Sequence, residues 1–222
     1  INSIHEFESQ IRNEIDERNL SGIDVPILVD DYVRQKFYHR YAQMSWYNNW
    51  TLSLVDWVFP QYEVMGYMRP EEIVRFDYGI CNQQAIVFQT VLMNLGFEYG
   101  SIRFSSPDFG HFTSAVKVDN EWYYFDSNLE PRYDRGNSAI FQRIISGDTD
   151  VLTNIYGDRF EGFSSEMVEF GNINEFPASR GVLVQDLTGW FSWYGWTVFL
   201  FPGFVVMWYR RRTQESTKSE VP

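Results

Sequence analysis

A stretch of 23 residues without a charged side chain, Leu187 to Tyr209, constrains this chain more than any other feature. At a rise of about 1.5 Å per residue, a helix of that length can cross a hydrocarbon layer of about 30 Å. Tryptophan and tyrosine gather at both ends of the stretch, where amphipathic rings favour the boundary between lipid and water. The sequence therefore predicts one transmembrane helix over residues 187–209. The alternative is a helix buried in the core of a soluble domain.

The charges beside this stretch predict its orientation. Three consecutive arginines, Arg210 to Arg212, follow it, whereas Asp186 precedes it. Because the basic flank of a membrane helix usually faces the cytoplasm, we expect residues 1–186 in the periplasm or outside the cell and residues 210–222 inside. The numbering begins at Ile1 rather than at a methionine, which we expect of a chain whose signal peptide or first membrane helix was removed or lies upstream.

The charge of the chain excludes one class of partner. Residues 210–222 contribute +2 to the total of −12, which leaves −14 on residues 1–209. A domain this acidic repels nucleic acid and favours cationic or neutral substrates. We therefore expect no nucleic-acid role, and we name membrane proteins as candidate partners of the apolar helix.

The length of 222 residues suits one domain with an appendage. We expect an N-terminal helical part over residues 1–70 and a core with a membrane-proximal segment over residues 71–186. The membrane helix over residues 187–209 and a short basic tail over residues 210–222 complete the chain.

Two helices are predicted in the N-terminal part. Ser3 and Glu6 have the spacing of a capping box, and apolar residues then recur at helical intervals to about residue 20. A second helix is expected over residues 30–54 and includes His39. We interpret His39 as a partly buried or surface side chain, because nothing around it in the sequence supplies a nucleophile.

The chain holds a single cysteine, Cys81, which excludes an intramolecular disulfide and a zinc site made of several thiolates. It follows Gly79, which permits a tight turn, and it begins a segment of helical periodicity that ends at Gly96. We therefore place Cys81 in the first turn of a helix, where the partial positive charge favours a nucleophilic thiolate. The competing interpretation is a small residue of the apolar core.

Three strands are predicted next, over residues 101–104, 111–118 and 121–125. The last two are separated by Asp119 and Asn120, which predicts a hairpin with a two-residue loop.

This register brings a histidine and an aspartate together. Thr113 lies opposite Asp126, so that His111 shares a face with Asp126 as a diagonal neighbour. We expect their backbones to lie about 7–8 Å apart and their side chains to lie closer. An imidazole can act as general base toward a cysteine, and a carboxylate can orient that imidazole and stabilise its charged form. Cys81, His111 and Asp126 are therefore the candidate catalytic residues. An aspartate at the end of a strand is also a common turn former.

Four short segments between residues 79 and 126 carry a resemblance to a known family: Gly79-Ile80-Cys81-Asn82-Gln83-Gln84-Ala85, Leu95-Gly96-Phe97, Gly110-His111-Phe112 and Glu121-Trp122-Tyr123-Tyr124-Phe125-Asp126. Over the stretch 79–126, about a fifth of the chain, the sequence resembles the transglutaminase-like superfamily. Papain-like proteases share the chemistry, but they place the histidine much further from the cysteine along the chain.

The resemblance implies an α+β fold, in which a helix bearing the cysteine packs on an antiparallel sheet of four to six strands. It implies Cys81 as nucleophile, His111 as general base and Asp126 as the residue that orients it. The chemistry is that of a cysteine peptidase, an amidase or a protein-glutamine acyltransferase, which forms a thioester with a protein or a cell-envelope peptide. No cofactor is implied. The alternative is an inactive binding or scaffolding subunit of a membrane complex with the same fold.

The sequence leaves the second donor of an oxyanion hole open. The backbone amide of Cys81 is the expected first donor, and Tyr78 and Gln61 are the candidates for the second. A metal site made of Cys81, His111 and Asp126 is a third interpretation, which lacks the accompanying residues that orient metal ligands.

Overall fold

The structure, a computed structural model, describes residues 3–60, 64–106, 110–128, 132–160 and 164–218. The chain forms two compact units. The core unit comprises residues 1–43 and 66–179, and the second unit comprises residues 44–65 and 180–222. We call the second the α3–α8 unit after its helices, α3 (Trp50–Val58) and α8 (Ser179–Lys218).

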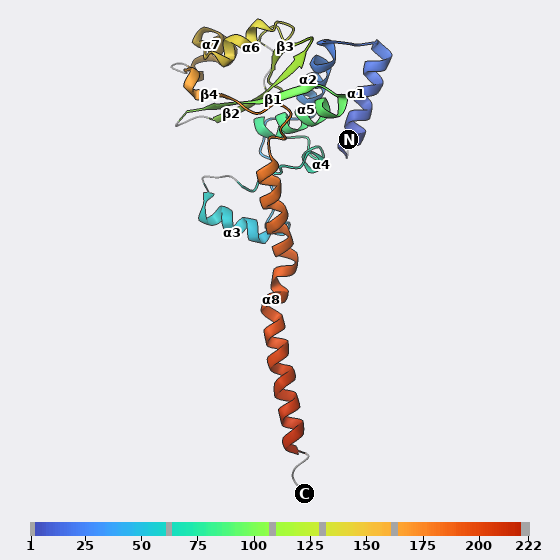
Figure 1. The fold of residues 1–222 in the computed structure, drawn as a ribbon, viewed down its shortest axis with the longest axis vertical. Coiled ribbons are helices and arrows are strands. Elements are labelled where there is room, and N and C mark those ends of the chain that lie inside the picture. The colour runs from blue at the N-terminus through green and yellow to red at the C-terminus, as the bar shows by residue number, and fades with distance from the viewer. Residues whose placement is uncertain (1–2, 61–63, 107–109, 129–131, 161–163, 219–222) are drawn as a thin grey trace. The chain divides into compact units, whose positions relative to one another are not determined.

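The helix that begins at Cys81, α5 (Cys81–Leu95), is the centre of the core unit. It contacts the helices α1 (Ile4–Arg18), α2 (Asp24–Lys36) and α4 (Pro70–Ile73) and the strands β1 (Glu98–Ser105) and β2 (Gly110–Val118) (Figure 1). Every residue from Gln83 to Leu92 is buried, as expected of a helix enclosed by other elements. The helix ends at Gly96, whose φ of 87° is the left-handed conformation predicted for this glycine.

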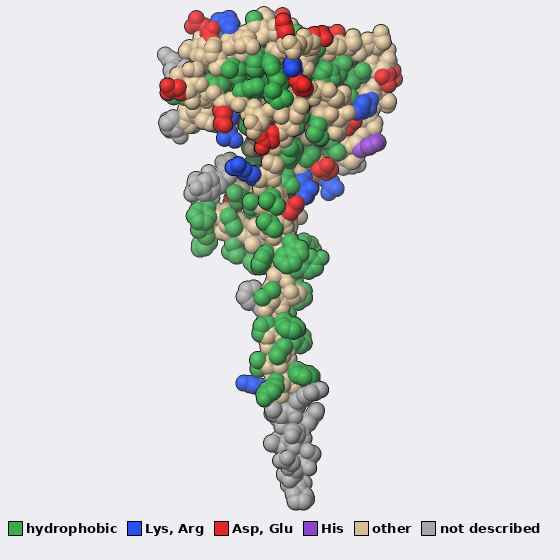
Figure 2. All heavy atoms as spheres, in the orientation of Figure 1, with side chains coloured by type: hydrophobic (Ala, Val, Ile, Leu, Met, Phe, Trp, Pro, Cys, Tyr) green, Lys and Arg blue, Asp and Glu red, His purple; other side chains and the backbone are tan. Residues whose placement is uncertain are grey.

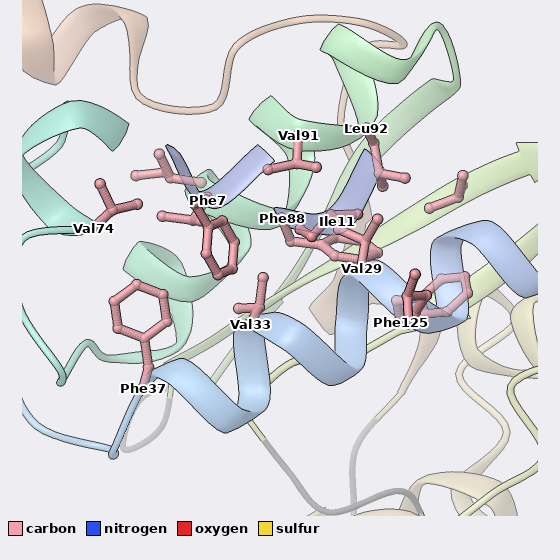
Figure 3. Close-up of a cluster of buried hydrophobic side chains, with 14 of the residues drawn as sticks. Phe7, Ile11, Val29, Val33, Phe37, Val74, Phe88, Val91, Leu92 and Phe125 are labelled. Carbon is pink, nitrogen blue, oxygen red and sulfur yellow. The ribbon is translucent and has the colours of Figure 1, made fainter. Parts of the chain in front are cut away.

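One cluster of apolar side chains holds α5 against the first two helices. Phe88 of α5 lies with Phe7 and Ile11 of α1 and with Val29 and Val33 of α2, all within a few per cent of complete burial (Figure 3). Each such side chain stabilises the fold by roughly 1.5–3 kcal/mol. The predicted start of α1 is confirmed, because the hydroxyl of Ser3 accepts a hydrogen bond from the backbone N–H of Glu6.

The predicted helix over residues 30–54 is wrong in its bounds. α2 begins at Asp24, ahead of a proline that its first turn tolerates, and ends at Lys36. The backbone then becomes extended, since Tyr38 donates its N–H to the carbonyl of Asp77 and accepts from the N–H of Gly79, each at 2.9 Å. His39 therefore lies in a loop that follows a segment paired with the approach to α5, not in a helix.

The core unit contains an antiparallel sheet of four strands in the order β3-β2-β1-β4 among the described residues. β3 is Glu121–Phe125 and β4 is Val168–Phe170. The predicted hairpin is confirmed, with Val118 paired to Glu121 and positive φ angles at both loop residues, Asp119 and Asn120. The fold is therefore the predicted α+β arrangement, in which a cysteine-bearing helix packs on an antiparallel sheet.

The other face of the sheet is covered by residues for which the sequence offers no prediction. α6 (Ala139–Ile145) and α7 (Thr149–Tyr156) follow the hairpin, and short 3-10 turns occupy Gly157–Phe160 and Ser165–Met167. Their apolar side chains form a second buried cluster with β1, β2 and β3, whose members are Ile102, Phe104, Ala115, Tyr124, Phe141, Ile144, Val151, Leu152, Ile155 and Phe160. Alternate residues of the strands thus point to opposite faces of the sheet and pack into two different apolar clusters.

The α3–α8 unit contains a helix that is long and apolar enough to cross a membrane, over Ser179–Arg210. It is the one such helix among the described residues, and its most apolar stretch is only 6% buried. Core helices of soluble domains are mostly buried, so this exposure favours the predicted span over its alternative. Hydrophobic side chains project all along this helix (Figure 2).

Candidate active site

Cys81 is the first residue of α5, as predicted, and its side chain is half-buried. The residue before the helix is Ile80, whose side chain cannot cap the first amides. The amide group of Gln83 holds the approach to the helix, because its Oε1 accepts from the N–H of Ile80 at 3.2 Å and of Ala42 at 3.1 Å. Its Nε2 donates to the carbonyl of Ala42 at 2.6 Å and of Tyr67 at 3.0 Å. Gln83 therefore fixes the loop that positions Cys81.

His111 lies at the start of β2, 7% exposed, and it forms an ion pair with Asp126. The Nε2–H group donates to Asp126 Oδ2 at 2.6 Å, which leaves Nδ1 as the nitrogen for the thiol of Cys81. Phe104, the partner of His111 in the register of β1 and β2, stacks on the imidazole with ring centres 6.0 Å apart. The diagonal relation predicted from the hairpin is therefore present as a direct contact.

The imidazole also interacts with Cys81. Burial of the ring disfavours its positive charge, but the charge and hydrogen bond of Asp126, followed by those of Cys81, outweigh burial. Together they raise the pKa of His111 to about 10. The structure thus brings the three candidate residues into one group of interacting side chains.

Asp126, 2% exposed, accepts two further hydrogen bonds that the sequence did not predict. The hydroxyl of Tyr156 donates to Oδ2 at 2.8 Å, and the backbone N–H of Asn128 donates to Oδ1 at 3.1 Å. Burial, followed by the charge of Asp126, raises the pKa of Tyr156 well above its ordinary value, so this hydroxyl stays a donor. The backbone N–H of Asp126 in turn donates to the hydroxyl of Tyr133 at 3.1 Å.

Asn128 joins the aspartate to two residues on other segments. Its Oδ1 accepts from Nε2 of Gln84 at 3.2 Å and lies 2.7 Å from Nδ1 of His39. His39 is exposed, as expected of a surface side chain, and it reaches the site through Asn128. Gln84 is one helical turn after Cys81, so it could have been found from helical spacing, whereas His39 could not.

A buried ion pair attaches the segment after Asp126 to α2. Ser127 donates to Oδ1 of Asp30 at 2.7 Å, and Arg135 donates to Oδ2 of Asp30 and to Asp31, each at 2.7 Å. Burial raises the pKa of Asp30 to about 6, although Ser127 and Arg135 act in the opposite direction. Burial also opposes the charge of Arg135, yet its bonds to Asp31 and Asp30 raise its pKa. Burial outweighs the ion pair in setting the pKa of Asp30 but not in setting that of Arg135, because the side chain of Asp30 is 1% exposed and that of Arg135 is 14% exposed.

A comparison with protein families matches residues 10–138, more than half of the chain, to the model of the transglutaminase-like domain. The chain belongs to the transglutaminase-like family. The matched residues include α5, the strands β1, β2 and β3 and all three candidate residues.

Other comparisons add little to this assignment of the transglutaminase-like family. A solved structure described as "Crystal structure of a TGase" is similar over 60% of this chain at 12% identity, with a TM-score of 0.38. The similar region is 36% of that structure's chain, so this protein spans about a third of it. None of the curated proteins matches the sequence.

Two predictions for this site remain, the second donor of the oxyanion hole and the alternative metal site. Of the two candidates for a second oxyanion donor, Gln61 lies outside the described residues. The ring of Tyr78 lies beside Phe76, with centres 5.3 Å apart, and beneath the guanidinium of Arg40 at 5.2 Å. Over the described ranges, no group of three His, Cys, Asp or Glu side chains is arranged to hold a metal ion.

Proposed function

We propose that this protein is a membrane-anchored cysteine acyl-transfer enzyme, a peptidase or amidase or an acyltransferase, in which Cys81 is the nucleophile. The observation that carries the proposal is the buried hydrogen bond of 2.6 Å between Nε2 of His111 and Asp126, on an imidazole that also interacts with Cys81. A cysteine that only filled the core would need neither partner. The membership of the transglutaminase-like family supports the same chemistry.

In the proposed reaction, the thiolate of Cys81 attacks the carbonyl carbon of an amide, either a peptide bond or a glutamine side chain. The positively charged imidazole of His111 gives its proton to the departing nitrogen, and an acyl thioester on Cys81 remains. Water or an amine then attacks the thioester, passes its proton to His111 and restores the thiol or thiolate. Asp126 stays ionised throughout and holds the imidazole in the productive tautomer.

The start of α5 supplies part of the stabilisation that this reaction needs. The first amides of a helix are free of intrahelical partners, and Ile80 offers no side-chain acceptor for them. The backbone N–H of Cys81 is therefore our proposed donor to the oxyanion of the tetrahedral intermediate. Removal of one such donor in other enzymes costs roughly 3 kcal/mol, which shows why the second donor also matters.

We also propose that α8 anchors the enzyme. Its apolar stretch carries tryptophan and tyrosine at both ends and is followed by Arg210, the first of three arginines. This arrangement supports a core unit outside the cytoplasm, with a protein or cell-envelope peptide as substrate. Since residues 1–209 carry a net charge of −14, we expect a cationic or neutral substrate.

The test is to trap the thioester. The protein is incubated with cell-envelope fractions, quenched in acid and analysed by mass spectrometry for an acyl adduct on the peptide that contains Cys81. We expect the adduct in the wild type and its absence in Cys81→Ala, His111→Ala and Asp126→Ala. If Cys81→Ser supports full function in cells and no adduct forms, the chain is the inactive binding or scaffolding subunit instead.

A further inference from the structure

The segment between the two halves of the core unit exposes an unusual number of aromatic and aliphatic side chains. Residues 44–60 contain one charged side chain, Asp56. Six large apolar residues of this segment are exposed: Trp46, Tyr47, Leu54, Trp57, Val58 and Phe59. Tyr47 is 92% exposed and Trp57 81% exposed. Contiguous apolar surface of this kind commonly marks a contact with another molecule or with a membrane.

This segment is attached to the first turns of the predicted membrane helix. Nδ2 of Asn49 donates to Thr188 at 2.8 Å and to the carbonyl of Gln185 at 3.2 Å. The indole N–H of Trp50 donates to the carbonyl of Ser192 at 2.9 Å, and the Ser192 hydroxyl contacts Asn49 and Thr51, each at 2.9 Å. These bonds hold the start of α3 against α8.

The place of attachment fixes the depth of α3. The predicted span begins at Leu187, so Thr188 and Ser192 lie within its first turn and a half, about 8 Å or less from its start. That is the level at which headgroups meet acyl chains. α3 runs across the direction of α8 rather than along it (Figure 1), and a helix that crosses a spanning helix lies in the plane of the membrane.

We propose that α3 and the loop before it form a second membrane contact, which inserts exposed aromatic side chains into the leaflet that holds the start of the predicted span at Leu187. This inference rests on the proposed membrane helix. Tryptophan and tyrosine are the residues that favour this depth, and Trp190, Trp193 and Tyr194, which are close to Ser192 in the sequence of α8, are exposed. Because residues 44–60 carry no basic side chain, the contact depends on apolar burial and not on anionic lipid.

Fluorescence quenching in nanodiscs tests the proposal. In the full chain with Cys81→Ala, a single cysteine at Trp57→Cys, Leu200→Cys or Gln10→Cys carries an environment-sensitive dye. The nanodiscs contain neutral phosphatidylcholine with a spin label either near the headgroup or near the end of the acyl chain. Tyr47→Cys is a second position in the segment, chosen because an almost fully exposed side chain can be replaced with little effect on folding.

We expect the dye at Trp57→Cys and Tyr47→Cys to be several-fold more quenched by the shallow label than the dye at Gln10→Cys, an exposed position of α1. The dye at Leu200→Cys should respond most to the deep label. Quenching at Leu200→Cys without quenching at either position of the segment would overturn the second contact and keep the anchor. The absence of quenching at Leu200→Cys would overturn the anchor itself.

Discussion

The proposed chemistry depends on the carboxylate of Asp126, which orients the imidazole of His111. Three donors from separate segments converge on it: the imidazole of His111, the hydroxyl of Tyr156 and the backbone N–H of Asn128. A carboxylate with several donors has one orientation, and it therefore determines which nitrogen of the imidazole faces the thiol. We regard Tyr156 as a positioning residue, because it acts through Asp126.

Asp126→Asn should lower the pKa of His111. Burial disfavours the charged ring, and without the charge of Asp126 mainly the interaction with Cys81 opposes it, so we expect a pKa well below about 10. Tyr156→Phe keeps the carboxylate, and we expect the pKa of His111 to stay far above 6.5. Nuclear magnetic resonance of histidine labelled with carbon-13 measures both values, since the chain has 3 histidines and His111→Ala assigns the signal. An unchanged pKa in Asp126→Asn would contradict the proposed role.

Asp30 should make the stability of the fold depend on pH. Its pKa rises from 3.8 to about 6 on folding, so the folded state binds more protons than the unfolded state between these values. The stabilisation is complete below about pH 4 and is lost as the pH rises through 6, by up to about 3 kcal/mol. We expect the free energy of unfolding of the wild type relative to Asp30→Asn to fall over this interval.

Ser127→Ala provides the matched variant for this measurement. The hydroxyl of Ser127 favours the charged form of Asp30, so its removal should raise the pKa of Asp30 further and extend the fall to higher pH. Urea unfolding at several pH values measures the three proteins. A difference between wild type and Asp30→Asn that does not change with pH would show that Asp30 keeps its ordinary titration.

At the scale of elements, two glycines with positive φ offer a comparison. Gly96 ends α5 with a φ of 87°, and a Cβ added there would meet no atom within 4 Å. Gly147 joins α6 to α7 with a φ of 69°, and an added Cβ would lie 2.3 Å from the backbone nitrogen of Ser165. The positive φ makes a side chain unfavourable at both positions, but only at position 147 would the side chain also clash with neighbouring atoms.

We therefore expect Gly96→Ala to lower the free energy of unfolding by about 1 kcal/mol, which is the cost of the left-handed conformation. Gly147→Ala should lower it by roughly 1–3 kcal/mol more, because backbone atoms must shift. Denaturant unfolding of both variants gives the comparison. Equal losses would mean that the contact between the α6–α7 turn and the segment at Ser165 is looser than the structure has it.

The elements that could be predicted from the sequence are those specified by neighbouring residues. The capping pair of Ser3 and Glu6, the glycine after Leu95 and the two-residue loop after Val118 each act over a few positions, and all three are present. The hairpin register then predicts that His111 and Asp126 share a face of the sheet as diagonal neighbours. The end of α2 at Lys36 is not predictable in this way, because Tyr38 pairs with Tyr78, 40 positions away in the sequence.

The parts of the site that the sequence did not predict come from distant segments. Tyr156 lies 30 positions after Asp126, and Arg135 lies 105 positions after Asp30. No periodicity relates such residues, since one contact follows from how α7 packs on the sheet and the other from how the segment at Arg135 lies against α2. The roles of Cys81, His111 and Asp126 as catalytic residues stay a prediction, although His111 and Asp126 interact as the register led us to expect.

At the scale of the whole molecule, the chain combines two units with opposite properties. The core unit contains the interacting group of Cys81, His111 and Asp126, and most of the chain's acidic residues lie in it. The α3–α8 unit is apolar and exposed over much of its described length. The proposed enzyme therefore performs its chemistry in one unit and is attached to a membrane by the other.

The most direct test of the proposed chemistry is the rate at which iodoacetamide alkylates Cys81 in the full-length protein. Because the chain has 1 cysteine, mass spectrometry of the intact protein follows that site alone. At slightly acidic pH we expect the wild type to react about tenfold or more faster than His111→Ala, since the imidazolium stabilises the reactive thiolate. Equally slow alkylation of both proteins would contradict an activated nucleophile at Cys81.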